Sequence, residues 1–183
     1  MPNPAVDIDI SAADSLEQET LDRYYAHTVV QSTMLATLNY IDMRIINGLT
    51  LPYFADSTEL WDTKPKALEL YITDLEEGRA LNLEARGKDY ATNILSYPSD
   101  MPASIVALMP TLPIGELIIC HEVIAREASE QNKSVEQHVI HLLIHGMLHL
   151  LGFDHELGLA EQNEMEGFEI DILAELNLPN PYI

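Results

Sequence analysis

The chain of 183 residues predicts an α+β fold, in which a small, mostly mixed four-stranded sheet packs against a buried central helix. Three observations predict this class: four short segments with strand patterns, several segments with helical apolar spacing, and one late helix that is apolar nearly all round. The length suits a single domain over residues 1–183, because a chain of this size can bury about 70% of its unfolded surface.

Four segments are expected to be strands. In the first, Val6, Ile8 and Ile10 alternate with aspartates, which is typical of a strand with one solvated face. The others are short apolar or alternating runs, and one of them is stopped by Pro98. The expected strands are 6–10, 68–72, 94–97 and 117–120.

Helices are predicted from capping residues and apolar spacing. Ser15 and Gln18 have capping-box spacing, so a helix is expected from there to about residue 38. Asp74 is expected to cap a helix over 75–85, and another helix follows the fourth strand to about residue 131. Two stretches rich in proline and turn formers are interpreted as irregular: an insertion over about 40–66 and a loop over 99–113.

The buried central helix is predicted to begin at a second capping box, formed by Ser134 and Gln137. It is apolar on nearly every side, and Gly152 is a plausible stop signal. A final amphipathic helix carries Met165, Phe168, Ile172 and Leu176. Strands followed by segregated helices favour the α+β class over an alternating α/β arrangement.

The composition narrows the classes of function. The formal charge of −21 argues against a nucleic-acid partner, although Arg79, Arg86 and Lys88 lie close enough to form a local basic patch. Cys120 is the only cysteine, so no intrachain disulfide is expected. The N-terminal residues lack the pattern of a signal peptide and no run is long enough to span a membrane, which predicts a cytoplasmic protein with no membrane contact.

Three histidines, His145, His149 and His155, have a spacing that can build a metal site. His145 and His149 are four residues apart, so on a helix their side chains share one face. If Gly152 ends the helix, the chain can turn back and bring His155 to the same ion. Three neutral imidazoles would leave a fourth position open for water, as in hydrolytic zinc enzymes.

The same helix offers an alternative set of metal ligands. His141 is also four residues from His145, but His141 and His149 would lie about 12 Å apart along the axis and would not share one ion comfortably. The set His145, His149 and His155 is favoured, because the glycine explains its third ligand. His138 and His141 are expected to be packing or helix-surface residues.

The spacing is also that of the metzincin proteases, H-E-x-x-H-x-x-G-x-x-H. Gly146 stands where those enzymes carry the glutamate that acts as general base. The sequence therefore disfavours a metalloprotease-like hydrolase, which stays as an alternative.

The string from His145 to His155, HGMLHLLGFDH, resembles the signature of the YbeY family of bacterial metal-dependent endoribonucleases. Residues 81–98 are similar to a second family block, residues 114–120 to a third, and Pro181-Tyr182 to the usual ending. The resemblance covers about residues 67–182 in collinear order. Ala85 replaces the aromatic residue that usually precedes the arginine, Glu116 replaces an aspartate, and the segment 40–66 is longer than usual.

This resemblance implies cleavage of single-stranded RNA, maturation of ribosomal RNA at the 3′ end of the 16S species, and ribosome quality control. The implied cofactor is one Zn²⁺ per chain, and the implied partners are rRNA precursor and the ribosome or ribosomal proteins. A zinc-stabilised, ribosome-associated binding factor without physiological catalysis is a further alternative.

The resemblance assigns Arg86 to the scissile phosphate, and a planar guanidinium suits bidentate phosphate contact. A surface ion pair of Arg86 with Glu84 or Asp89 is the competing interpretation. Asp154 is expected either to orient a histidine ligand or to form a turn. Surface or turn roles are expected for four further residues of the arginine segment: Lys88, Thr92, Asn93 and Ser96.

Overall fold

A computed structural model describes residues 6–183 of the chain as one α+β domain. Its sheet has the order β1-β2-β4-β3, in which β1, β2 and β4 run parallel and β3 pairs antiparallel with β4. The mixed four-stranded sheet expected from the sequence is confirmed. The strands are β1 (Val6–Ala12), β2 (Lys66–Thr73), β3 (Ile94–Pro98) and β4 (Leu112–Cys120).

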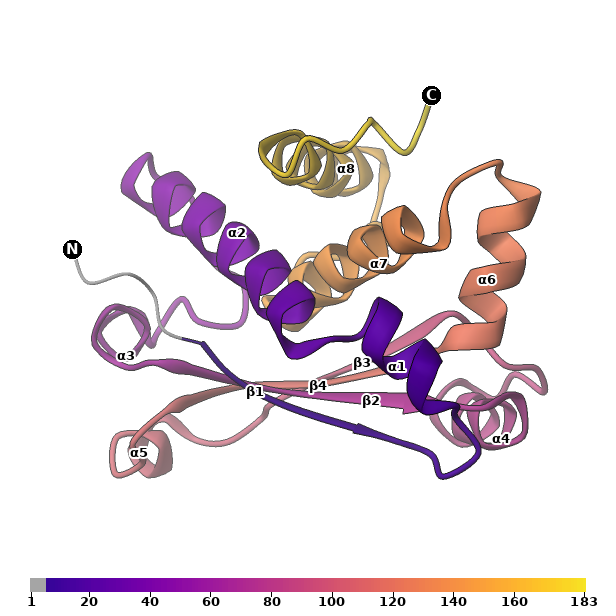
Figure 1. Ribbon diagram of the computed structural model, residues 1–183. Helices are drawn as coiled ribbons and strands as arrows, with labels where there is room; N and C mark the ends of the chain where they lie inside the picture. Colours follow the sequence, from indigo (N-terminus) through magenta and orange to yellow (C-terminus); the bar gives the residue numbers. More distant parts are fainter. Residues whose placement is uncertain (1–5) are drawn as a thin grey trace.

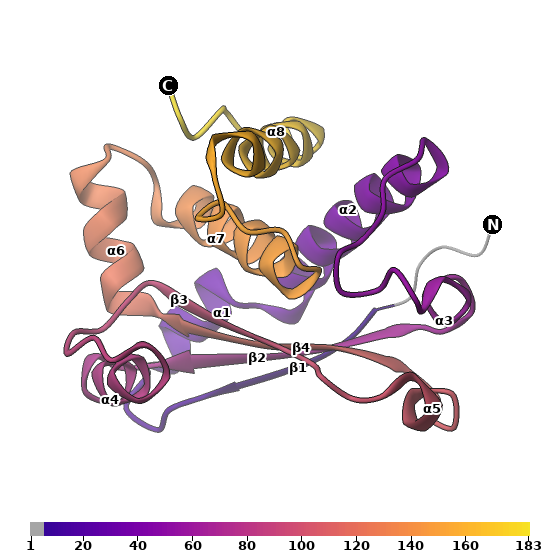
Figure 2. The ribbon, with the colours of Figure 1, turned by 180° about the vertical axis from the view of Figure 1, so that it is seen from behind.

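The longer helices gather on one face of the sheet (Figures 1 and 2). On the other face, Asp7, Asp9 and Glu69 are exposed, which explains the alternating pattern of β1 and β2. Helices α4 and α5 lie at opposite ends of the sheet (Figure 1). The helices are α1 (Gln18–Tyr24), α2 (His27–Ile46), α3 (Thr58–Thr63), α4 (Leu75–Arg86), α5 (Ala103–Val106), α6 (His121–Glu130), α7 (Val135–Leu150) and α8 (Leu159–Glu175).

The first expected helix is in fact two. The chain leaves helical geometry at Tyr25 and Ala26, which separates α1 from α2. The break buries the Tyr25 ring and lets its hydroxyl meet His121 Nδ1 at 2.8 Å. The expected capping box is also wrong, because the Ser15 hydroxyl donates to Asp74 Oδ2 instead of capping α1.

The segment 40–66 is more regular than its prolines suggest. Helix α2 continues to Ile46 and α3 covers Thr58–Thr63, so only the residues between them form turns. Buried Trp61 anchors α3, and its indole N–H donates to Asp42 of α2 at 2.8 Å. The expected loop at 99–113 likewise contains α5, and β4 begins at Leu112, five residues before the expected strand.

Helix α7 is the central helix that the sequence predicts. Both hydrogen bonds of the Ser134–Gln137 capping box are present. The helix packs against β3 and β4 on one side and against α2, α6 and α8 on others. Gly146 faces the sheet: a Cβ atom there would stand 2.6 Å from Ile94 Cδ1 and 2.8 Å from Leu117 Cδ2. A larger residue at this position would force the ends of these two side chains to shift, so glycine favours the close contact between helix and sheet.

Within residues 6–183, none of the helices combines the length and apolar character needed to cross a bilayer.

Candidate active site

The three predicted histidines lie together at the C-terminal end of α7. One nitrogen from each of His145, His149 and His155 lies within 4.8 Å of the other two. The Nε2 atoms of His145 and His149 face each other at 3.1 Å. Two nitrogens bound tetrahedrally to one zinc ion at about 2.0–2.1 Å lie about 3.3 Å apart, so this pair already has the spacing of ligands.

The turn after α7 brings the third histidine into place. Helix α7 ends at Leu150, and Gly152 has a φ of 105°, a backbone conformation that residues other than glycine rarely adopt. A Cβ atom at Gly152 would also stand 2.7 Å from Pro52 Cβ, so the turn is packed against the segment between α2 and α3. Glycine at position 152 therefore permits both the reversal of the chain and the close approach of the turn to Pro52.

A buried carboxylate supports the first histidine from behind. Glu169 of α8 is 1% exposed, and its Oε1 lies 2.7 Å from His145 Nδ1. Because a carboxylate can only accept, His145 donates from Nδ1 and leaves the lone pair of Nε2 facing His149. An imidazole held in this way by a carboxylate is typical of metal-binding histidines.

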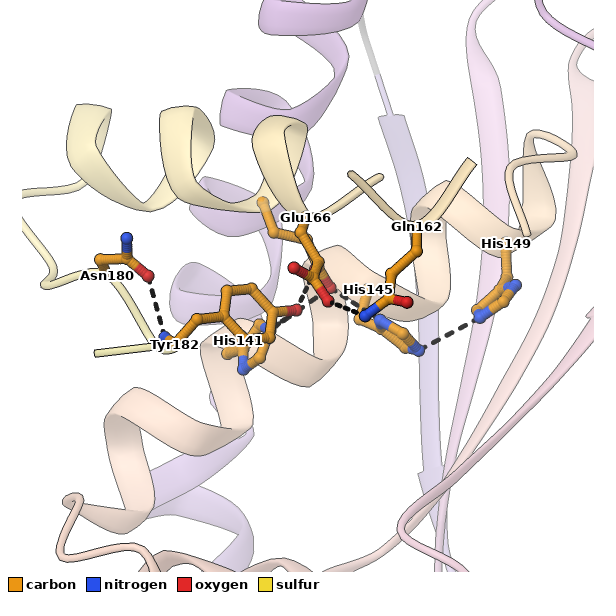
Figure 3. Close-up of polar contacts among 8 residues, drawn as sticks. His141, His145, His149, Gln162, Glu166, Asn180 and Tyr182 are labelled. Atoms are coloured by element: carbon orange, nitrogen blue, oxygen red, sulfur yellow. Dashed lines mark hydrogen bonds and ion pairs between the residues drawn. The ribbon is translucent and has the colours of Figure 1, made fainter. Parts of the chain in front are cut away.

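The same carboxylate receives two further groups. His141 Nε2 lies 3.3 Å from Glu169 Oε1, and the Tyr182 hydroxyl donates to Glu169 Oε2. Figure 3 shows His141, His145 and His149 projecting from α7 while Tyr182 reaches in from the C-terminal segment. One buried acid thus connects the end of the described chain to the histidine cluster.

Charge states in the cluster suit metal binding. Burial raises the pKa of Glu169, but hydrogen bonds with His141 and His145 outweigh this effect and bring the pKa down to about 2. Burial, together with the neighbouring His145 and His155, lowers the pKa of His149 to about 4. At neutral pH the acid is therefore ionised and His149 is neutral, which is the form of imidazole that binds metals.

The donor set fits a zinc ion. Three imidazoles converge, and His155 Nδ1 is buried without a hydrogen-bond partner among the residues described. An unpaired buried nitrogen is costly, and coordination would remove that cost.

Arg86 opens onto the same cleft as the three histidines, although it lies 59 residues before His145. It is the last residue of α4, which ends because Gly87 takes a left-handed conformation with a φ of 69°. Its Nη2 atom lies 3.6 Å from Glu156 Oε1, a pair with both side chains well exposed. Glu84 is not its partner, and Asp89 is held by Arg79 through two hydrogen bonds of 2.7 and 2.8 Å.

The remaining predicted residues divide between cleft and surface. Asp154 lines the cleft and forms a turn, since its Oδ1 accepts from the Glu156 N–H. Thr92, Asn93 and Ser96 also line the cleft, whereas Lys88 is exposed and does not.

Glu169 was missed by the sequence analysis, yet the sequence contained a signal for it. It lies on the apolar stripe of α8, between Met165 and Phe168 on one side and Ile172 on the other. An acid on a buried stripe needs a partner, and here the partners are histidines. A second pair was also missed: buried His138 bonds Glu127 of α6 at 2.8 Å.

Comparison with known proteins agrees with this geometry. The profile described as "Endoribonuclease YbeY" matches residues 41–177. The chain belongs to the YbeY family.

Three relatives named endoribonuclease YbeY illustrate the match. The protein of Psychrobacter cryohalolentis is 71% identical over 152 residues, which are 82% of this chain and 98% of that protein. The protein of Psychrobacter arcticus is 73% identical over 74% of this chain and 66% of its own length. That of Acinetobacter baumannii is 53% identical over 60% of this chain and 69% of its own length.

The YbeY fold is also seen in a solved structure of low sequence identity. The solution structure of TM1509 from Thermotoga maritima aligns with a TM-score of 0.50 at 18% identity, over 93% of this chain and 91% of that one. The YbeY family is one of metalloenzymes, which agrees with the histidine cluster at the end of α7.

Proposed function

We propose that this chain is a zinc-dependent endoribonuclease that cleaves single-stranded RNA, with one Zn²⁺ held by His145, His149 and His155. The observation that carries the proposal is the convergence of these histidines with Arg86 in one cleft. Family membership supports RNA as the substrate class. The resemblance further supports rRNA precursor as substrate, the 16S 3′ end as target, the ribosome as partner and the cytoplasm as location.

Each group in the cleft has a defined task in this proposal. The bound ion supplies Lewis acidity and activates water at neutral pH. Arg86 binds the scissile phosphate and stabilises the charge that develops on it. Its pair with Glu156 is long and exposed, so a phosphate can displace it at little cost. Glu169 holds His145 in the orientation and tautomer that a metal ligand requires.

The experiment that tests this proposal compares Arg86→Glu with Lys88→Glu, which makes the same charge change two residues away and outside the cleft. Arg86→Glu is expected to reduce cleavage of single-stranded RNA by at least about 100-fold, because a phosphate ligand is replaced by an acid. Zinc content should stay at about one per chain, since Arg86 contacts none of the three histidines in the hydrogen bonds and ion pairs of the described residues. Loss of zinc in this variant would indicate that Arg86 has a structural role.

A peptide hydrolase is the second candidate, and the edge of the sheet favours it. Cys120 N–H donates to Asn93 C=O, and Ser99 N–H donates to Ile114 C=O. Hydrogen-bonded positions alternate along an antiparallel pair, so the backbone of Ser96 points to the free edge of β3, where an extended peptide could pair.

Gly146 argues against a protease function. It has no side chain to act as general base, and a Cβ atom at this position would meet the core side chains of Ile94 and Leu117. Incubation of the zinc-loaded protein with casein and with single-stranded RNA separates the two activities. A variant that loses cleavage but still rescues ribosome assembly in cells would instead favour a binding factor.

A further inference from the structure

The cleft is larger than the metal centre needs. It has a volume of about 800 Å³ and continues from Arg86 and the three histidines past His141. Its second half, here called the distal half, is lined by Asn93, Glu127, Gln131, Lys133 and His138. His138 precedes His145 by seven residues on α7, a separation of about 10 Å along the helix axis. None of these residues has a task in the proposed reaction.

Hydrogen bonds connect the side chains that form the wall of the distal half. Buried His138 bonds Glu127 Oε2 through Nε2 at 2.8 Å, and Asn93 Nδ2 donates to both oxygens of the same carboxylate. These contacts tie α6, α7 and the start of β3 together. Both oxygens of the Glu127 carboxylate therefore have hydrogen-bond partners within the wall.

Lys133 is the cation of the distal half. It is partly buried just before α7, and it forms no ion pair with any acid within residues 6–183. Among the described residues, Arg86 and Lys133 are the arginine and lysine that line the cleft, and Glu127, Asp154 and Glu156 are the acids that line it. The pair of Arg86 with Glu156 is long and exposed, and Lys133 forms no close ion pair in the described chain, so both cations can contact an anionic ligand.

The free edge of β3 adds a neutral hydrogen-bond donor to the cleft. Ser96 lines the cleft, and its backbone N–H points away from β4. Backbone N–H groups together with lysine and arginine are common ligands of nucleic-acid phosphates. The arrangement suits a single strand of nucleic acid whose successive phosphates lie along the cleft.

We infer that Lys133 binds a backbone phosphate flanking the scissile one, so that the distal half is the subsite for the adjoining stretch of the RNA strand. This inference rests on the proposed nuclease function and adds a residue that determines substrate length. Substrates with a single phosphodiester would not reach Lys133, whereas oligonucleotides would.

The test compares Lys133→Gln with Arg126→Gln, which removes one positive charge from exposed α6 outside the cleft. With zinc-loaded enzyme and a single-stranded RNA of about ten nucleotides, Lys133→Gln should raise KM by about 3- to 10-fold and leave kcat unchanged. Both variants should hydrolyse bis(4-nitrophenyl) phosphate, which has no flanking phosphate, at the wild-type rate. Arg126→Gln should match the wild type throughout.

A binding measurement keeps the inference testable if the wild type does not cleave RNA. Fluorescence anisotropy in the His149→Ala background gives the salt dependence of RNA affinity with and without Lys133. Loss of one phosphate contact should reduce the slope of log affinity against log salt by about 0.7 for a single strand. An unchanged slope and KM would overturn the inference, as would an equal loss of activity on the small diester. Absence of RNA cleavage by the wild type would instead overturn the proposed function.

Discussion

At the scale of residues, the candidate metal centre depends on one acid as much as on its three histidines. Glu169 is buried, ionised and shared between His145, His141 and Tyr182. A carboxylate so placed selects the histidine nitrogen that faces the ion and raises its basicity. Arg86 lies across the cleft and has no part in this network, so metal affinity and phosphate binding should respond to different substitutions.

Glu169→Gln should weaken zinc binding by about 10- to 100-fold, because the amide is a poorer acceptor for His145 Nδ1–H. Glu166→Gln is the matched control, since Glu166 lies three residues earlier on α8 and, among the described residues, its side chain hydrogen-bonds only Gln162. Competition with a chromophoric chelator measures both affinities. Equal zinc affinity in the two variants would show that Glu169 does not support the metal ligand.

At the scale of elements, the site is set by where α7 ends. Gly152 turns the chain directly after the helix, and its packing against Pro52 and Tyr53 connects His155 to the segment between α2 and α3. The geometry of the third histidine therefore depends on residues about a hundred positions earlier in the chain.

Gly152→Ala should lower both stability and zinc affinity, because the new methyl group is strained at a φ of 105° and meets Pro52 Cβ at 2.7 Å. Gly48→Ala is the control: Gly48 has a φ of 100°, but nothing lies within 4 Å of its Cβ position. Each variant should lose about 1–3 kcal/mol of unfolding free energy from backbone strain. Thermal unfolding and zinc titration measure the two effects, and an unchanged zinc affinity in Gly152→Ala would contradict the role of this turn.

Elements with strong local signals were predictable from the sequence. Helix α7 followed from its capping box and apolar surface, and β1 and β2 from their alternation. The break between α1 and α2 was not predictable, because it is caused by the burial of Tyr25 against His121, a contact between distant segments. The prolines of segment 40–66 suggested irregular chain, but Trp61 stabilises α3 through contacts with Asp42 and Phe54.

In the candidate site, too, the residues in local patterns were predictable and the contacts between distant elements were not. The spacing on α7 and the Gly152 turn indicated the three histidines, and the resemblance indicated Arg86. Spacing could not reveal that α8 places Glu169 behind His145, or that α6 places Glu127 against His138, because these contacts arise only when helices pack.

At the scale of the whole molecule, the charge of −21 is reconciled with an RNA substrate by the location of a few cations. Arg86 and Lys133 line one cleft beside Glu127, Asp154 and Glu156, while Arg23, Arg79 and Arg126 form ion pairs outside that cleft. Surface charges separated by more than about 8 Å are largely screened at physiological salt, so the distant acids of the surface do not prevent Arg86 and Lys133 from contacting phosphate.

The most direct test of the account is zinc content measured beside cleavage of single-stranded RNA in the wild type and in His149→Ala. His27→Ala is the control, because His27 is exposed at the start of α2 and outside the cleft. Wild type and control should hold about one zinc per chain and cleave the RNA, whereas His149→Ala should lose both properties. Wild-type cleavage by His149→Ala would contradict a metal centre built on these three histidines.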